Sequence, residues 1–186
     1  VCEGAMGFYD GQGLTIRASA WELADALDLP VLLVVQPKGA SVTLAAEIQG
    51  LVHFKPESHI AGILLNDCSE KLFRMLKPLL ETETGLPVRA LLRPRFGDFC
   101  YDRYELAQMA ETAAALVQAG ADGIVTGVLT PEGEPDVDAL RPIYAAARAA
   151  AKAAGVRAVE LSEPRRVCRR LIFVSYAAMG SVSRVA

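Results

Sequence analysis

Short runs of apolar residues alternate along this chain with longer segments in which apolar residues recur at helical spacing. The apolar runs predict strands at residues 1–5, 31–35, 60–65, 88–92, 124–128 and 156–161. The amphipathic segments predict helices at residues 19–27, 41–54, 69–84, 101–119 and 138–154. Strands separated by helices are typical of a parallel sheet covered on both faces, so the pattern predicts an α/β fold.

Polar residues mark the ends of several predicted helices. Ser19 and Glu22 have the spacing of a capping box, and Ser69 is a candidate N-cap. Pro78 is expected to kink the helix that Ser69 begins, and Gly85 ends it.

The predicted elements form a single three-layer domain over residues 1–162. Its mainly parallel sheet of about six strands is expected to be flavodoxin-like or Rossmann-like rather than a complete TIM barrel. Residues 163–186 form a tail in which a cluster of arginines precedes an apolar run. The arginines could dock a phosphate group or form a solvated face, and the apolar run could add an edge strand or dock loosely.

Composition excludes several classes of partner. The net charge is −3, and no basic stripe is interleaved with aromatic residues, which argues against nucleic acid. The apolar runs are too short to cross a bilayer, so no membrane partner is expected. The four cysteines Cys2, Cys68, Cys100 and Cys168 are scattered, which predicts reduced thiols in a cytoplasmic protein. The chain begins at Val1 rather than Met, so a further upstream portion is an expectation.

Two groups of polar residues follow predicted strands. Glu3 ends the first strand, and Asp10 lies in the glycine-rich loop after it. Ligands of open α/β sheets bind beyond the carboxyl ends of strands, so these carboxylates could hold Mg²⁺ or orient a substrate. The alternative is a pair of solvated loop acids.

The second group lies in the loop after the strand at 88–92. Arg93, Arg95 and Asp98 could bind an anionic ligand through bidentate hydrogen bonds. Alternatively, Asp98 pairs with an arginine and orders the loop.

Residues 1–88 resemble the cobyrinic acid a,c-diamide synthases. Residues 1–11 read VCEGAMGFYDG, which is similar to the Glu-Gly-x-Met-Gly-x-x-Asp-Gly signature of that family, and the segments 18–20, 31–39 and 62–66 agree in order. The resemblance implies an ATP-dependent, Mg²⁺-dependent amidoligase of cobalamin biosynthesis that takes ammonia from glutamine. It implies that Glu3 is associated with metal and nucleotide, that Asp10 handles the activated intermediate, and that Asn66 precedes the adenine pocket.

The 186 residues contain no Gly-x-x-x-x-Gly-Lys-Ser/Thr phosphate loop, which this chemistry needs to anchor Mg-ATP. The glutaminase domain of the family is also absent after residue 88. An upstream segment would have to supply the phosphate loop.

From about residue 86 to 147 the chain resembles the CutC copper homeostasis proteins. Residues 92–101 read LRPRFGDFCY, which is similar to the Ile-Arg-Pro-Arg-Gly-Gly-Asp-Phe-x-Tyr motif, and residues 120–130 match the next strand and its loop. The resemblance implies part of a TIM barrel, about two of its eight βα units. Phe96 replaces a motif glycine and would strain the loop if that position requires a positive φ. Copper binding is implied by the family, although Cys100 is the only local thiolate, the ligand type that Cu(I) favours.

The hypothesis is therefore a hybrid of two families joined near residue 87, expected to fold as an α/β protein without complete catalysis. The alternatives are a CutC-like protein that handles copper or an unidentified small molecule, and an amidoligase remnant that needs an upstream phosphate loop. An exposed sheet edge could be closed by a homodimer.

Overall fold

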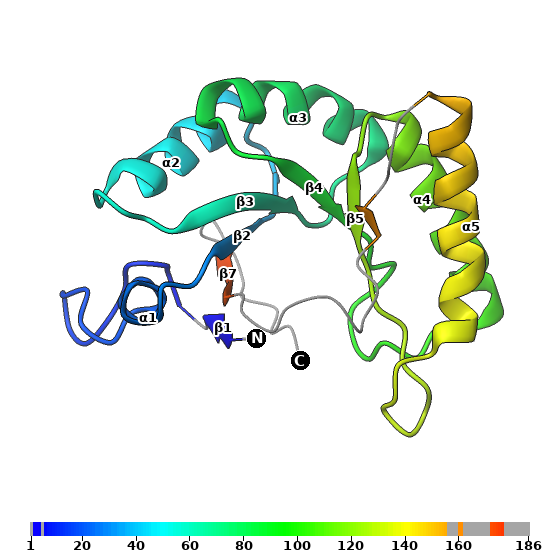
Figure 1. The fold of residues 1–186 in the computed structure, drawn as a ribbon, viewed down its shortest axis with the longest axis horizontal. Coiled ribbons are helices and arrows are strands. Elements are labelled where there is room, and N and C mark those ends of the chain that lie inside the picture. The colour runs from blue at the N-terminus through cyan, green and yellow to red at the C-terminus, as the bar shows by residue number, and fades with distance from the viewer. Residues whose placement is uncertain (1, 5, 156–159, 162–171, 177–186) are drawn as a thin grey trace. The chain divides into compact units, whose positions relative to one another are not determined.

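A computed structural model describes residues 2–4, 6–155, 160–161 and 172–176 of the chain. The strands are β1 (Cys2–Gly4), β2 (Val31–Val35), β3 (Ile60–Leu65), β4 (Val88–Leu91), β5 (Gly123–Val125), β6 (Glu160–Leu161) and β7 (Ile172–Tyr176). The helices are α1 (Ala20–Leu27), α2 (Val42–His53), α3 (Glu70–Thr84), α4 (Arg103–Gln118) and α5 (Val137–Ala153). The predicted α/β alternation with parallel strand pairing is confirmed (Figure 1).

The described chain divides into two compact units. The first contains residues 2–66, 76–88 and 172–176, and the second contains residues 67–75, 89–155 and 160–161, each within the described ranges. The boundary falls inside β4, between Val88 and Arg89. The sequence predicted one domain over residues 1–162, with halves that meet near residue 88, and this domain organisation stays a prediction.

The first unit is built on four parallel strands in the order β1-β7-β2-β3. Leu33 of β2 is paired with Val174 of β7 on one side and with Ile63 of β3 on the other. Because β7 pairs with both β1 and β2, it is an interior strand, and the predicted edge strand in the tail is wrong on this point. Residues 163–171 lie outside the described residues, as does the arginine cluster within them.

The alternation of apolar residues explains why these segments pack. Val31, Leu33 and Val35 of β2 are almost completely buried, as are Leu44 and Ile48 of α2. β-Branched and leucine side chains at period two in the strand and at period three to four in the helix supply one apolar face each. Burial of these faces is the main favourable contribution to folding of this unit.

The second unit has three parallel strands in the order β4-β5-β6 and two long helices. Helices α4 and α5 lie side by side (Figure 1). Met109 and Ala113 of α4 and Ile143 and Ala147 of α5 are each at most 1% exposed. The many alanines allow close approach of the two helices at low entropic cost.

Helix caps agree closely with the sequence pattern. The Ser19 hydroxyl accepts a hydrogen bond from Glu22 N–H, as predicted, while Glu22 Oε2 accepts from Ala18 N–H. The Ser69 hydroxyl accepts from Leu72 N–H at 3.3 Å at the start of α3. Pro78 lies inside α3, as the sequence indicates.

Two boundaries differ from the sequence pattern. Helix α4 begins at Arg103 rather than at residue 101, because Asp102 is its N-cap. The strand predicted at 124–128 ends at Val125, and Leu129 instead forms an antiparallel bridge with Pro135. No helix in the described part of the chain is both long enough and apolar enough to cross a bilayer.

Candidate functional site

The end of β4 holds the start of the arginine-rich loop against β5. Leu92 N–H donates to Val125 O at 2.8 Å, and the Thr126 hydroxyl donates to Leu92 O at 2.8 Å. β4 ends at Leu91, and α4 begins twelve residues later, at Arg103. The loop at residues 93–102 is therefore anchored at one end by a strand and at the other by a helix cap, beyond the carboxyl ends of parallel strands where ligand sites of α/β proteins occur.

Arg95 is fully engaged by the loop itself. Its Nη2 donates to Asp98 Oδ1 at 2.9 Å and to Cys100 O at 2.7 Å. Its Nη1 donates to the carbonyl oxygens of Phe96 and Asp98 at 3.2 and 3.3 Å, and its Nε donates to Glu105 Oε1. The hydrogen bonds that Arg95 donates to Glu105 and then to Asp98 raise the pKa of Arg95, and the bond from Arg95 lowers the pKa of Asp98. The pairing of Asp98 with an arginine, one of the two predicted alternatives, is what the structure contains.

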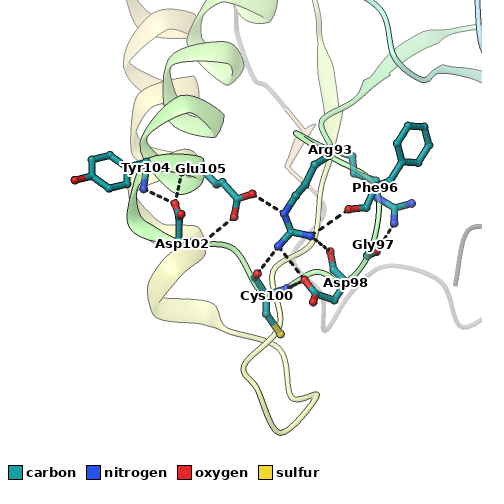
Figure 2. A network of polar contacts seen from close by, with 9 residues as sticks. Arg93, Phe96, Gly97, Asp98, Cys100, Asp102, Tyr104 and Glu105 are labelled. Atoms are coloured by element: carbon teal, nitrogen blue, oxygen red, sulfur yellow. Dashed lines mark hydrogen bonds and ion pairs between the residues drawn. The ribbon is translucent and has the colours of Figure 1, made fainter.

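Glu105 is a residue of this site that sequence reasoning missed. Its Oε2 accepts from Asp102 N–H at 2.8 Å, while the Asp102 carboxylate accepts from Tyr104 N–H and Glu105 N–H. This is a complete capping box. The Asp-x-x-Glu spacing in the sequence could have identified the cap. Figure 2 shows Asp98 in the loop and Glu105 on α4. Arg95 forms an ion pair with each of these two acids.

Arg93 is held differently. Its Nη2 donates to Gly97 O at 2.7 Å (Figure 2). Its guanidinium carbon lies 4.7 Å from the ring centroid of Phe99. Its Nε and the hydroxyl of Tyr101 are buried without a hydrogen-bond partner among the described residues. Burial raises the pKa of Tyr101, and the positive charges of Arg93 and Arg95 oppose that shift. A half-buried arginine oriented by an aromatic ring and a carbonyl group is suited to bind an oxyanion.

Phe96 does not strain the loop. The position with a left-handed backbone is Gly97, with φ of 100°, and Phe96 is not among the residues with positive φ. The Phe96 side chain is 73% exposed. The strain considered for this replacement therefore does not arise.

The glycine-rich loop of the first unit is closely folded. Asp10 N–H donates to Gly7 O at 2.9 Å, and a Cβ at Gly7 would lie 2.2 Å from Asp10 Oδ2. A Cβ at Gly11 would lie 2.1 Å from Arg17 O. A larger residue at Gly11 would collide with the backbone of the loop, whereas a larger residue at Gly7 would meet the Asp10 side chain, which can move aside.

The other predicted residues of this half are less constrained. Asp10 is exposed, and the Glu3 side chain lies outside the described residues. Asn66 follows β3, where its N–H donates to Val35 O at 2.8 Å. No hydrogen bond joins Asp10 to Asn66 among the described residues, so their predicted roles remain predictions.

The described residues limit which metal and thiol chemistry the chain can support. Within it, no group of three or more His, Cys, Asp and Glu residues is arranged to hold a metal ion. Cys100 Sγ contacts Thr130 O at 3.3 Å. Burial, together with the charges of Asp67 and Glu70, raises the pKa of the Cys68 thiol to about 11.

Comparison with known proteins divides the chain in the same way as its motifs. The CutC family model matches residues 75–164. A family protein CutC from Vibrio atlanticus is 42% identical over 69 residues, which are 37% of this chain and 28% of that protein. The crystal structure of the copper homeostasis protein CutC from Streptococcus agalactiae has a TM-score of 0.51 at 22% identity, covering 64% of this chain and 55% of that one. At this identity the likeness concerns the fold alone.

A different part of the chain matches cobyrinate a,c-diamide synthases. The synthase of Clostridium acetobutylicum is 43% identical over 81 residues, which are 44% of this chain and 18% of that protein. The synthase of Salmonella typhimurium is 38% identical over 96 residues, which are 50% of this chain and 21% of that protein. The chain thus spans about a fifth of the length of these relatives. These matches confirm the prediction that its two parts resemble two different families.

Proposed function

We propose that this hybrid α/β protein binds a small oxyanion through Arg93 and has no complete catalytic site. The observation that carries the proposal is the contrast between its two loop arginines. Arg95 donates from all three of its guanidinium nitrogens, to loop carbonyl groups, to Asp98 and to Glu105, whereas Arg93 donates from Nη2 to Gly97 O. Of the three predicted ligand-binding residues Arg93, Arg95 and Asp98, only Arg93 is therefore proposed to contact the ligand.

Phosphate, sulfate and carboxylate ligands share the required chemistry. A guanidinium edge offers two parallel N–H donors that match two oxygens of such a ligand. Stacking on Phe99 and the bond to Gly97 O orient Arg93 before a ligand arrives. Less side-chain entropy is then lost on binding than for a free surface arginine.

The test is an isothermal titration with inorganic phosphate, repeated with sulfate and acetate. Arg93→Ala is expected to abolish binding, and Arg93→Lys to weaken it because an ammonium cannot bind bidentately. Arg103→Ala is the matched control, since Arg103 is an exposed arginine stacked 4.5 Å from the Tyr104 ring. Equal affinity in Arg93→Ala and wild type would overturn the proposal.

The half that resembles the synthases is proposed to be a folded remnant. Mg²⁺ and ATP belong to it by resemblance, with Glu3 and Asp10 as their candidate residues. The 186 residues lack a phosphate-loop motif, so the backbone amides and lysine that anchor Mg-ATP have no counterpart in them. Calorimetry of the chain with Mg-ATP is expected to show no Mg²⁺-dependent binding. ATP turnover that Glu3→Ala abolishes would instead establish the amidoligase alternative.

Copper handling is the second candidate, and the match of residues 75–164 to the CutC family favours it. Cys100 lies within the arginine-rich loop, it is half-buried, and its Sγ contacts Thr130 O. A Cu(I) competition assay would compare Cys100→Ala with Cys68→Ala as control. Equal Cu(I) affinity in wild type and Cys100→Ala would exclude a role for the Cys100 thiol.

The strand order also bears on the finer architecture. In the first unit β1, β2 and β3 occur across the sheet in the same order as along the chain, and in the second unit so do β4, β5 and β6. Right-handed crossovers in one direction place successive helices on one face, whereas a flavodoxin-like sheet reverses direction and covers both faces. We infer that barrel-like winding is favoured over the flavodoxin-like arrangement expected from the sequence. The CutC fold likeness supports this inference.

A further inference from the structure

Glu105 divides the two oxygens of its carboxylate between two elements. Oε1 accepts from Arg95 Nε in the loop, and Oε2 accepts from Asp102 N–H at the start of α4. The Glu105 side chain is 23% exposed, compared with 67% for that of Asp98, the other acid on Arg95. Water therefore screens the bond between Arg95 and Glu105 less than the bond between Arg95 and Asp98.

The Arg95 guanidinium, held by Glu105, in turn fixes the positions of carbonyl groups in the loop. Once Glu105 fixes Nε, the planar guanidinium has one orientation left in which Nη1 and Nη2 reach the carbonyl oxygens of Phe96, Asp98 and Cys100. Gly97 lies between two of those carbonyl groups, and its own carbonyl accepts from Arg93. The orientation of Arg93 thus depends on the segment that Arg95 orders.

We propose that Glu105 is the positioning residue of the Arg93 site, and that it sets the geometry of the loop from the first turn of α4. The proposal rests on the oxyanion-binding function of Arg93. This role differs from that of a purely structural capping residue. A residue that only capped α4 would stabilise the helix without affecting the oxyanion affinity of Arg93, which lies twelve residues earlier in the chain.

Glu105→Gln is the sharpest variant because it is nearly isosteric. Both oxygens of Glu105 accept from N–H donors, and a glutamine retains one acceptor and presents two donors in place of the other. One of the two contacts must therefore be lost. Asp136→Asn is the matched control: Asp136 caps α5 by accepting from Ala139 N–H at 2.9 Å, and no contact joins it to Arg95 among the described residues.

The experiment uses the full chain and two measurements. The first is the ¹⁵N-edited NMR signal of the arginine Nε–H groups, in which Arg95 is expected to exchange slowly with water in wild type and rapidly in Glu105→Gln. The second is the affinity for inorganic phosphate, which is expected to fall about tenfold in Glu105→Gln, as for other residues that orient a binding group. Asp136→Asn is expected to leave both measurements unchanged.

Arg95→Lys changes the Arg95–Glu105 ion pair through Arg95 and leaves the Glu105–Asp102 capping box intact. It therefore tests the proposal even if Glu105→Gln does not fold. It is expected to lower phosphate affinity to a similar extent. Wild-type phosphate affinity in both variants would overturn the role of Glu105. Absence of phosphate binding by wild type would overturn the function proposed for Arg93, and the Arg95 Nε–H signal would still decide whether Glu105 orders the loop.

Discussion

Arg93 and Arg95 are two residues apart, yet their surroundings give them different chemistry. Arg95 lies between two acids and three carbonyl groups, so its charge is neutralised and its donors are used within the protein. Arg93 lies on an aromatic ring, which orients a cation without occupying its hydrogen-bond donors. The number of acidic partners, rather than the charge of the side chain itself, therefore distinguishes a candidate binding arginine from a structural one.

The Arg95–Asp98 contact should depend on pH in the acid range. The hydrogen bond from Arg95 lowers the pKa of Asp98 below its ordinary value of 3.8, so the contact contributes stability above pH 3.8 and loses it as the pH falls through the lower folded pKa. A ¹³C titration of the Asp98 carboxyl is expected to give a midpoint below 3.8 in wild type and a higher one in Arg95→Ala. Arg141→Ala, which removes the exposed pair with Asp138, serves as control and should leave the Asp98 midpoint unchanged. The same midpoint in wild type and Arg95→Ala would contradict the assignment.

Cys68 should react slowly with alkylating reagents. Burial raises its pKa to about 11, and the charges of Asp67 and Glu70 act in the same direction. At pH 8 about one thiol in a thousand is then a thiolate, the form that attacks iodoacetamide. Mass spectrometry is expected to show a Cys68 alkylation rate that keeps rising between pH 8 and 10 in the folded chain. In urea the rate should level off near pH 9, and identical profiles in both conditions would refute the prediction.

The candidate site could be predicted from the sequence only in part. Arg93, Arg95 and Asp98 were identified from an abrupt change from apolar to polar residues, and the pairing of Asp98 with an arginine was one of two alternatives. The sequence does not determine which arginine pairs, because that depends on how the loop turns at Gly97. Glu105 was missed because its contact with Arg95 spans ten residues and joins a loop to a helix.

Helix starts show how local sequence controls these elements. Asp102 and Asp136 each accept backbone N–H bonds from the first turn of their helices, which satisfies donors that have no partner within the helix. Ser41 is likewise the residue immediately before a helix, α2, yet its side chain makes no cap hydrogen bond. The presence of a capping residue type is therefore insufficient, since the backbone must also direct the side chain to the helix.

This difference gives a prediction with an internal control. Asp102→Ala is expected to lower the free energy of unfolding by about 1 kcal/mol, the typical value for loss of an N-cap. Ser41→Ala is expected to change it by only a few tenths of a kcal/mol, because no cap bond is lost. Urea unfolding followed by circular dichroism would measure both. Equal losses in the two variants would contradict the role of the cap geometry.

At the scale of the whole molecule, the repeated alternation of apolar runs and amphipathic segments was sufficient to predict the α/β class. Strands such as β2 and β3 were located accurately because they are continuous apolar runs between helices. The position of β7 could not be predicted, because it pairs with β1 and β2, which lie more than 130 residues earlier in the chain. Residue patterns indicate which segments are strands, but pairing between distant strands is a property of the folded sheet.

The interior position of β7 leads to the last prediction. A chain that ends after Val167 lacks β7, which pairs with β1 and is one of the two strands that pair with β2, whereas a chain that ends after Ser183 retains β7. Loss of an edge strand would break one ladder of hydrogen bonds, but loss of β7 breaks two and separates β1 from the sheet. The shorter chain is expected to lose more than about 3 kcal/mol of the free energy of unfolding. Hydrogen exchange should be faster at the β2 amides, with Leu33 as the central probe, and equal protection of β2 in the two truncated chains would show that β7 is dispensable.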